Sequence, residues 1–170
     1  MPAGLKQTSS VVAIGFQTIE SAANTLTQTS VDLNLSPLDR EVFVVLAVNL
    51  DPYFPEVITG TDTSVNAALT TTSQTSLPEI SNSNCIAKAT NYIAAGAAPG
   101  QQVGFTQAAL ETPPSTLEYI GIIATNDFFV QVKGVGNTTA KGINGKLYGY
   151  RARADASIYS ALVQSEVLSS

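Results

Sequence analysis

Apolar and polar residues alternate along several stretches of the chain, as they do in half-buried β-strands. In TLTQTSVDLNL, Val31, Leu33 and Leu35 fall on one face, while the residues between them are polar. In EVFVVLAVNL, residues 41–50, both faces are apolar. A strand of this kind is either central in a sandwich or covered on both sides. These stretches therefore predict a β-sheet protein with at least one fully buried strand.

The stretch LEYIGIIATNDFFVQVKG is mostly apolar and is broken at its middle by an Asn-Asp pair. Residues 118–125 and 128–133 each have the composition of a strand, and Asn and Asp tolerate the positive φ of a two-residue hairpin turn. The pattern predicts a hairpin that turns at Asn126 and Asp127, at a rim of the sandwich. The residues that would share one face of its second strand are Phe128, Val130 and Val132.

Residues 81–100, SNSNCIAKATNYIAAGAAPG, carry the signals of one short helix. Apolar residues recur at helical spacing, serines that can cap a helix precede them, and Gly96 and the pair Pro99 and Gly100 follow. The apolar residues at this spacing are Ile86, Ala89, Ile93 and Ala97. The pattern predicts a helix over about residues 82–96. The tail SIYSALVQSEVLSS fits a strand or a short helix.

Short strands with turn signals between them predict the fold class. About seven or eight strands and one helix indicate a mainly β protein, an antiparallel β-sandwich or a jelly roll. The length of 170 residues fits one domain. Residues 1–10 are small and polar, which predicts a flexible N-terminal arm before a single β-sandwich domain at 11–170. The longest apolar runs are far below the roughly 20 residues of a membrane helix, so we expect no membrane insertion.

The chain is poor in charge, and this changes the picture of its surface. Charged residues make up 12% of the sequence, whereas about 25% is usual. The surface is therefore built largely from Ser, Thr, Asn, Gln, Ala and Gly. Either the protein has an unusually neutral surface, or neighbouring subunits cover much of it, because interface cores are depleted in charge.

The cationic residues of the second half follow one another with no acid between them. They are Lys133, Lys141, Lys146, Arg151 and Arg153. They form either a solvated strand face or a contact with the acidic part of a neighbouring copy. In a regular strand Tyr148 and Tyr150 face away from the two arginines, whereas a groove for single-stranded nucleic acid needs aromatic and cationic groups together. With a net charge of −5, nucleic acid is not expected as a partner.

The residues of the chain do not form a known catalytic motif. The sequence contains no His, which excludes Ser-His-Asp and Cys-His catalysis and removes a common metal ligand. Cys85 has no basic residue closer than Lys88, and a small buried thiol is the expected role. We therefore predict that the chain is not an enzyme and needs no cofactor.

Two further sites stay open in the sequence. The stretch NLDPYFPEVITGTD offers Asn49, Asp51, Glu56 and Asp62 as oxygen ligands for a hard cation, without the spacing of an EF-hand loop. Asn137 begins an NTT glycosylation sequon, which matters only in a eukaryotic secretory setting.

The stretches TGTDTSVNAALTTTSQTS and YIGIIATNDFFVQVKGVGNTTAKG carry a resemblance in composition and strand rhythm. Over most of its length the chain resembles small capsid, decoration or tail proteins of bacterial and archaeal viruses. The resemblance implies a structural subunit in a symmetric virion shell or tube, with copies of itself and other virion proteins as partners. It rests on no family motif, so it carries over no functional residue. The subunit contacts that we predict are Lys146, Tyr148, Tyr150, Arg151, Arg153 and Asp127.

The alternative is a β-sandwich module that binds carbohydrate or another ligand, at an extracellular surface or in the cytoplasm. The absence of Trp and the scarcity of polar groups that converge beside an aromatic side chain weigh against it.

Overall fold

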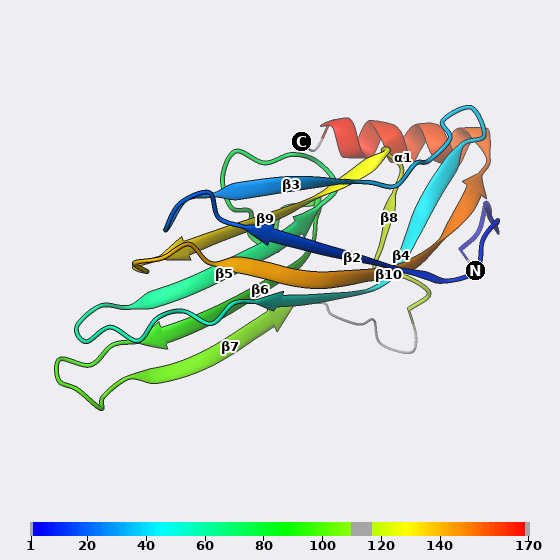
Figure 1. Cartoon of the computed structure of the whole chain (residues 1–170). Coiled ribbons are helices and arrows are strands. Elements are labelled where there is room, and N and C mark those ends of the chain that lie inside the picture. Colours follow the sequence, from blue (N-terminus) through cyan, green and yellow to red (C-terminus); the bar gives the residue numbers. More distant parts are fainter. Residues whose placement is uncertain (1, 110–116, 169–170) are drawn as a thin grey trace.

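The computed structural model describes residues 2–109 and 117–168 of the chain. These residues form ten strands and one helix (Figure 1). In chain order they are β1 (Leu5–Gln7), β2 (Val12–Ile19), β3 (Thr27–Asp32), β4 (Glu41–Pro52), β5 (Thr63–Thr70), β6 (Cys85–Ala94), β7 (Val103–Ala109), β8 (Gly121–Ile123), β9 (Asp127–Val135), β10 (Gly142–Ala154) and α1 (Ala156–Leu168).

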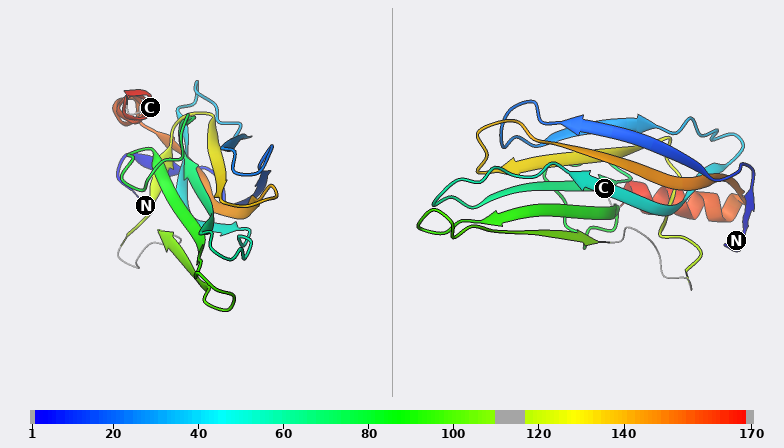
Figure 2. Two further views of the ribbon diagram at one scale, coloured as in Figure 1. Left: turned by 90° about the vertical axis from the view of Figure 1, so that its left-hand side faces the viewer. Right: turned by 60° about the horizontal axis from the view of Figure 1, so that its bottom comes forward.

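The strands form two antiparallel sheets that face each other along the length of the molecule (Figure 2). We call them sheet A and sheet B. Sheet A has the order β2-β10-β4-β8, and β1 pairs with the end of β10 on the edge that β2 also uses. Sheet B has the order β3-β9-β5-β6-β7. Helix α1 lies on the outer side of sheet A, against the half of that face built from the start of β4 and the end of β10.

Without β1 and β7, the remaining eight strands pair in nested order. The first pairs with the last (β2 with β10), the second with the seventh (β3 with β9), the third with the sixth (β4 with β8) and the fourth with the fifth (β5 with β6). This order, in two four-stranded layers, is that of a jelly roll. It confirms the predicted mainly β sandwich and selects the jelly roll.

The main core lies between the two sheets. Its largest fully buried side chains include Leu33, Phe43, Phe128 and Leu147. Phe128 also meets the ring of Phe16 edge to face, with 5.8 Å between the ring centroids. Each large apolar side chain that is fully buried contributes roughly 1.5–3 kcal/mol to folding. The predicted inner face of β9, with Phe128, Val130 and Val132, is confirmed.

Strand β4 is covered on both sides, as its sequence predicted. The strand also contains a β-bulge, because Tyr148 pairs with Ala47 and Gly149 with Val45, so that Leu46 has no partner on β10. The side chains facing sheet B are Phe43, Val45, Val48 and Leu50, and those facing α1 are Val42 and Val44. Ordinary alternation before the bulge thus supplies both apolar clusters, and the bulge moves the core-facing positions from odd-numbered to even-numbered residues.

The predicted helix at residues 82–96 is wrong, because β6 occupies this segment. β6 pairs with β5 on one edge and with β7 on the other, and its buried side chains alternate in steps of two. The small side chains of Ala87 and Ala89 pack closely between the sheets, which suits a strand as well as a helix. The helix is instead α1, where the Asp155 carboxylate caps the Ile158 N–H at 2.9 Å.

The predicted hairpin at Asn126 and Asp127 is also wrong. β8 belongs to sheet A and β9 to sheet B, so the chain crosses between the sheets at this point. Asn126 holds the corner: its carbonyl oxygen accepts the Leu33 N–H at 2.8 Å and its side-chain oxygen accepts the Leu35 N–H at 2.7 Å. A polar break between two apolar runs has the same local sequence in a hairpin and in a crossing between sheets.

Two strands were not anticipated, which explains why there are ten described strands and not seven or eight. One is β6, and the other is β1, which lies within the segment expected to be a flexible arm. Leu5 pairs with Ala154 and Gln7 with Ala152 at the end of β10. Within residues 2–109 and 117–168, no helix has the length and apolar character that a membrane crossing requires.

Candidate functional site

Two of the predicted contact residues lie on the open half of the outer face of sheet A. Lys146 pairs with Gly15 on β2 and with Asn49 on β4, and Tyr148 pairs with Ala13 and Ala47. The residues that pair with Lys146 and Tyr148 are thus small or neutral, and the two side chains border a hollow of about 300 Å³ that Asp51 also lines. We call this half of the outer face the open face of sheet A.

Tyr150 lies on the same side of β10 but is covered. Its side chain packs with Ala152 and Ala154 in the cluster under α1 and is 6% exposed. Burial, the largest cause, and the nearby Glu118 carboxylate raise its pKa. Tyr150 therefore stabilises the docked helix within this chain.

The two arginines have acidic partners in their own chain. The Arg151 Nη1 atom lies 3.2 Å from the Glu41 Oε1 atom and 3.1 Å from the carbonyl oxygen of Asn34. The Arg153 Nη2 atom lies 3.9 Å from the Asp39 Oδ1 atom. Both arginines thus hold the loop between β3 and β4. The role of either residue in a subunit contact stays a prediction.

Asp127 begins β9 opposite Asp32 of β3. Two like charges directly across a strand pair repel each other. Among the described residues, however, no three acidic or cysteine side chains form a group that could hold a metal ion. Asp127 lies in sheet B, whereas the other predicted contacts lie in sheet A.

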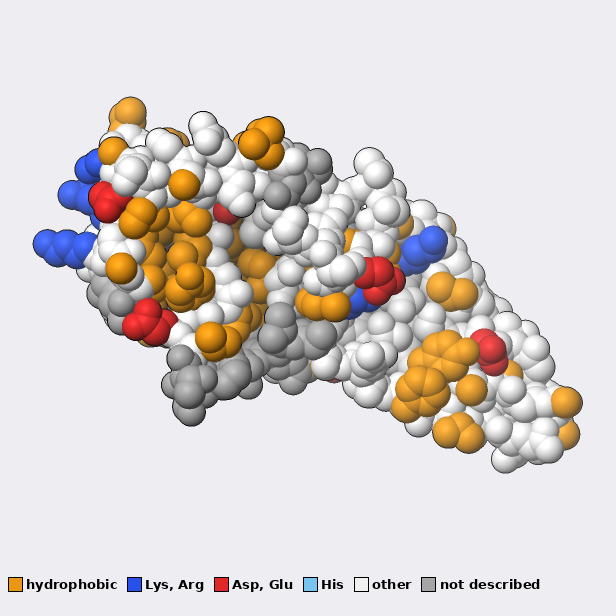
Figure 3. Space-filling view, turned by 180° about the vertical axis from the view of Figure 1, so that it is seen from behind, with side chains coloured by type: hydrophobic (Ala, Val, Ile, Leu, Met, Phe, Trp, Pro, Cys, Tyr) orange, Lys and Arg blue, Asp and Glu red, His pale blue; other side chains and the backbone are white. Residues whose placement is uncertain are grey.

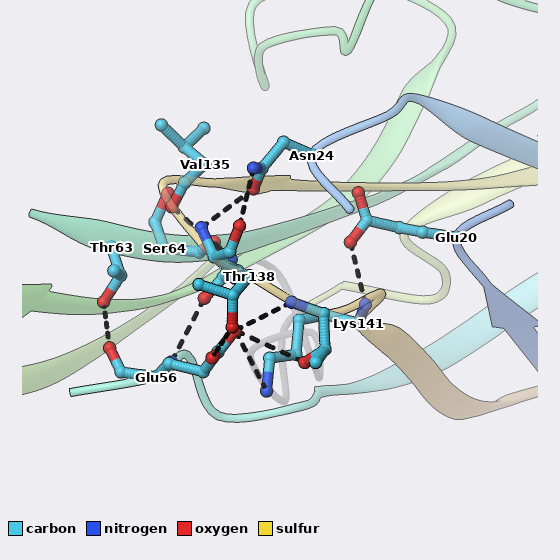
Figure 4. Close-up of polar contacts among 10 residues, drawn as sticks. Glu20, Asn24, Glu56, Thr63, Ser64, Val135, Thr138 and Lys141 are labelled. Carbon is cyan, nitrogen blue, oxygen red and sulfur yellow. Dashed lines mark hydrogen bonds and ion pairs between the residues drawn. The ribbon is translucent and has the colours of Figure 1, made fainter. Parts of the chain in front are cut away.

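One end of the jelly roll is closed by a network of carboxylates and backbone N–H groups (Figure 4). Glu56, from the loop after β4, accepts the N–H groups of Thr138 at 2.7 Å and Thr139 at 3.1 Å, and also the Thr138 hydroxyl. The Thr138 hydroxyl bond, the Thr139 and Thr138 backbone bonds and the Lys141 ammonium lower the pKa of Glu56 to about 2. Glu56 therefore supplies the acceptors that the loop between β9 and β10 lacks.

Glu20 does the same from the loop after β2. Its buried carboxylate accepts N–H groups from Gly134 at 2.9 Å, Thr25 at 2.8 Å and Lys141 at 2.8 Å. A buried carboxylate that accepts three backbone bonds is well compensated for its loss of hydration. The network is thus a structural closure of this end of the sandwich.

The sequon residue Asn137 lies inside this network. Its Nδ2 atom donates to the carbonyl oxygen of Ser64 at 2.9 Å, and its Oδ1 atom accepts the Glu56 N–H at 3.1 Å. The side chain is buried. A glycan on the Nδ2 atom would displace the bond to Ser64 and would need space that this buried position lacks, so the sequon does not present an accessible acceptor in the folded chain.

The four residues proposed as cation ligands do not act together. Glu56 is held by the β9–β10 loop, and Asp62 accepts the Ala95 N–H at 2.8 Å, which with a hydrogen bond from Tyr92 lowers the Asp62 pKa. Asn49 and Asp51 instead border a hollow of about 690 Å³ between the end of β4 and the inner side of β6 and β7. Cys85 is buried, and burial raises the pKa of its thiol.

Large apolar side chains are exposed on several sides of the described molecule. Figure 3 shows such side chains gathered near α1 at one end and near the β6–β7 loop at the other. The most exposed are Leu38 (96%) in the loop before β4, Leu168 (83%) at the end of α1 and Val57 (66%) in the loop after β4. Isolated exposed apolar residues are ordinary, but several groups on separate sides indicate contact surfaces.

No protein-family model matches this chain, and none of the curated proteins does. Among solved structures, the chain is similar to a chain from Desmodium yellow mottle tymovirus, with 15% sequence identity over 92% of this chain and 96% of that chain. The TM-score of 0.28 is too low to support an inference. The jelly-roll assignment rests on the strand order alone.

The structure also brings together a group of residues that sequence reasoning missed. Tyr92 of β6 and Phe105 of β7 pair across the outer face of sheet B, beside Thr90 and Gln107. The predicted helix at residues 82–96 placed no residue of this segment opposite β7, so the pair was not expected. The alternation of Lys88 and Thr90 with Ala87 and Ala89 was the signal that could have revealed it.

Proposed function

We propose that this chain is a structural subunit of a large homo-oligomeric assembly, a virion, and that it acts by packing against copies of itself and other virion proteins. The observation that carries the proposal is the exposure of large apolar side chains on several separate sides of a jelly roll. Only 12% of the residues are charged, and some of these charges are used inside the chain by the loop network and the arginine pairs.

The exposed groups are too far apart for one interface. Leu38 and Val57 lie in the loops at opposite ends of β4, whose 12 residues span roughly 40 Å at the usual rise per residue. Leu168 lies on the outer side of sheet A, and Val135 of β9 lies on the outer side of sheet B. A single partner would cover only one of these regions. Several neighbours around each subunit, as in a shell or a tube, would cover all of them.

The fold is compatible with this role but does not decide it. Jelly rolls form viral capsid subunits, and they also form lectin domains and enzymes of the cupin type. The proposal therefore rests on the surface and on the low charge. Packing between subunits requires neither a catalytic residue nor a cofactor.

We assign one subunit contact to the open face of sheet A, through Lys146 and Tyr148. Both side chains stand on the open face beside the small residues Ala13, Gly15 and Ala47. Tyrosine is enriched at interface cores, and a lysine at the edge of such a contact can select an acidic partner.

The test is the state of association of the purified full chain. Size-exclusion chromatography with light scattering, over a range of protein concentration and salt, should show large species, and electron microscopy should show them as ordered particles. A protein that stays monomeric at high concentration under all of these conditions would overturn the proposal.

The contact on sheet A is tested with a double variant, Lys146→Glu with Tyr148→Ser. It should impair assembly while the thermal unfolding of the monomer stays close to that of the unmodified chain. Lys133→Glu is the matched control, because Lys133 is an exposed lysine on sheet B. Equal impairment by both variants would show an effect of net charge and would refute the assigned contact.

A further inference from the structure

We infer that the outer face of sheet B, where β5, β6 and β7 lie side by side, is a binding site for a neutral carbohydrate. The site combines an aromatic pair with a row of amide and hydroxyl side chains on three neighbouring strands. It is independent of the proposed assembly role, since a virion subunit needs no such site to pack.

The aromatic part of the site is the pair Tyr92 and Phe105. The two residues face each other across β6 and β7, with 4.9 Å between their ring centroids and 31° between their planes. The Phe105 side chain is 51% exposed, so the pair presents an apolar surface to solvent. A pyranose ring has an apolar C–H face that packs well on the electron-rich face of such rings.

The position of Tyr92 is fixed before any ligand arrives. Its hydroxyl forms a hydrogen bond with the Asp62 carboxylate, and this bond is the main cause of its raised pKa. Asp62 is itself held by the N–H of Ala95 at 2.8 Å. A side chain that is already held in place loses little conformational entropy on binding, which favours affinity. Figure 3 shows hydrophobic side chains beside an acidic one at this end of the molecule.

The polar part of the site lies one row further along the sheet. Asn66 of β5 pairs with Thr90 of β6, and Thr90 pairs with Gln107 of β7. The Thr90 hydroxyl donates to the Asn66 side-chain oxygen at 3.1 Å, which leaves the lone pairs of the hydroxyl free to accept. Within the described part of the chain, the exposed side-chain amide of Gln107 has no hydrogen-bond partner. These groups match the closely spaced hydroxyls of a sugar.

The row borders a hollow of about 310 Å³, which the segment with Glu79 and Ile80 closes on one side. This volume is at the lower end of the range of ligand sites in proteins. The Lys88 Nζ atom lies 2.7 Å from the Glu79 Oε2 atom, so the charges in the hollow compensate each other. The pairing favours a neutral ligand over an acidic one. One sugar ring would occupy the hollow, and the next ring would lie on Tyr92 and Phe105.

The first measurement is the retention of the full chain, as purified, on an array of neutral oligosaccharides of glucose, galactose, mannose and N-acetylated hexosamines, with sialylated and uronic-acid glycans as a comparison. We expect specific retention on a subset of the neutral glycans. Absence of retention on all of them, or retention on the acidic glycans alone, would overturn the inference.

The second measurement is the affinity of the best neutral oligosaccharide for site variants, by titration calorimetry. Phe105→Ala should weaken binding by about tenfold, and Gln107→Ala should weaken it several-fold. Phe54→Ala is the matched control, because Phe54 is 55% exposed but borders the hollow on the inner side of the sandwich. Unchanged affinity in both site variants, or equal loss in the control, would refute the site. Neither outcome bears on assembly, which is measured separately.

Discussion

The Glu166 carboxylate, near the end of α1, accepts the backbone N–H of Ala124 at 2.7 Å, at the corner where the chain passes from sheet A to sheet B. Its second oxygen accepts the N–H of Thr125 at 3.2 Å. Glu166 is the buried residue of α1, whereas the apolar residues of the helix that face sheet A are only partly buried. A polar contact therefore fixes the end of the helix to the sandwich.

Replacing Glu166 with Ala should destabilise the protein by about 1–3 kcal/mol, because the N–H groups of Ala124 and Thr125 would lose their acceptors. Urea unfolding followed by circular dichroism measures this change. Ser165→Ala, at the exposed neighbouring position, is the control and should leave the midpoint in place. A Glu166→Ala variant with unchanged stability would show that the contact contributes little to the fold.

The same residue predicts a dependence on pH. Burial raises the pKa of Glu166 above its value in the unfolded chain, despite the hydrogen bonds from Ala124 and Thr125. The folded state then binds the proton more tightly, so this contribution to stability is present at low pH and is lost as the pH rises through the folded pKa.

The unmodified chain should therefore lose stability relative to the Glu166→Gln variant as the pH rises from 4 to 8. Unfolding free energies of the two proteins at a series of pH values test this. A difference that is flat with pH, or that shifts the other way, would contradict the prediction.

Glu56 should show the opposite dependence. Its pKa is lowered to about 2, chiefly by the Thr138 hydroxyl and the Thr139 N–H. A lowered pKa gives a contribution that is present above the pKa of the unfolded chain and is lost as the pH falls towards 2. Glu56→Gln should thus be less stable than the unmodified chain at pH 7, and the two should converge in acid. A constant gap between them across this range would be evidence against the role of Glu56 in closing the loop end.

Reversing the charge of Arg151 should lower the stability of the monomer. Arg151→Glu would break the pair with Glu41 and place two carboxylates side by side. The pair is partly exposed, so we expect a loss of about 1 kcal/mol or less, seen as a small drop in Tm. The double variant Arg151→Glu with Glu41→Arg should recover most of it. If the swap recovers nothing, the ion pair is not the cause of the loss.

Two glycines should differ sharply in their tolerance of a methyl group. A Cβ on Gly149 would overlap the Val44 carbonyl oxygen and the ring of Phe43, whereas a Cβ on Gly15 would meet no atom within 4 Å. Gly149→Ala should cost about 1–3 kcal/mol or more, and Gly15→Ala should be neutral or slightly stabilising. Thermal unfolding of the two variants side by side gives the answer, and similar Tm values would contradict the close packing at Gly149.

Sequence patterns predicted the features that depend on which side chains become buried. The alternation in β9 placed Phe128 and Val130 on the inner face, and the apolar faces of β4 required a cover on each side. The patterns did not predict pairing partners. The Ala-rich sequence of β6 is compatible with both a helix and a strand, and only the pairing with β5 and β7 selects the strand.

The candidate sites show the same contrast between burial, which sequence patterns predict, and pairing partners, which they do not. Low charge indicated either an unusually neutral surface or coverage by neighbouring subunits, but no local pattern shows that Arg151 meets Glu41, which is 110 residues away in the sequence. The pairing of Tyr92 with Phe105 depends on the register between two strands, and register is a property of the folded sheet. Such sites become visible only after the strands are assigned.

The unpaired Leu46 in β4 has a consequence for insertions and deletions. Before it, odd-numbered side chains such as Val45 face the core, and after it even-numbered ones such as Val48 do. Deleting Leu46 would remove the bulge itself, because Val45 and Ala47 would then follow one another and pair with Gly149 and Tyr148 in a regular ladder. Every later side chain would keep its side, with Val48 and Leu50 still in the core, so a chain shorter by this single residue would keep its jelly roll.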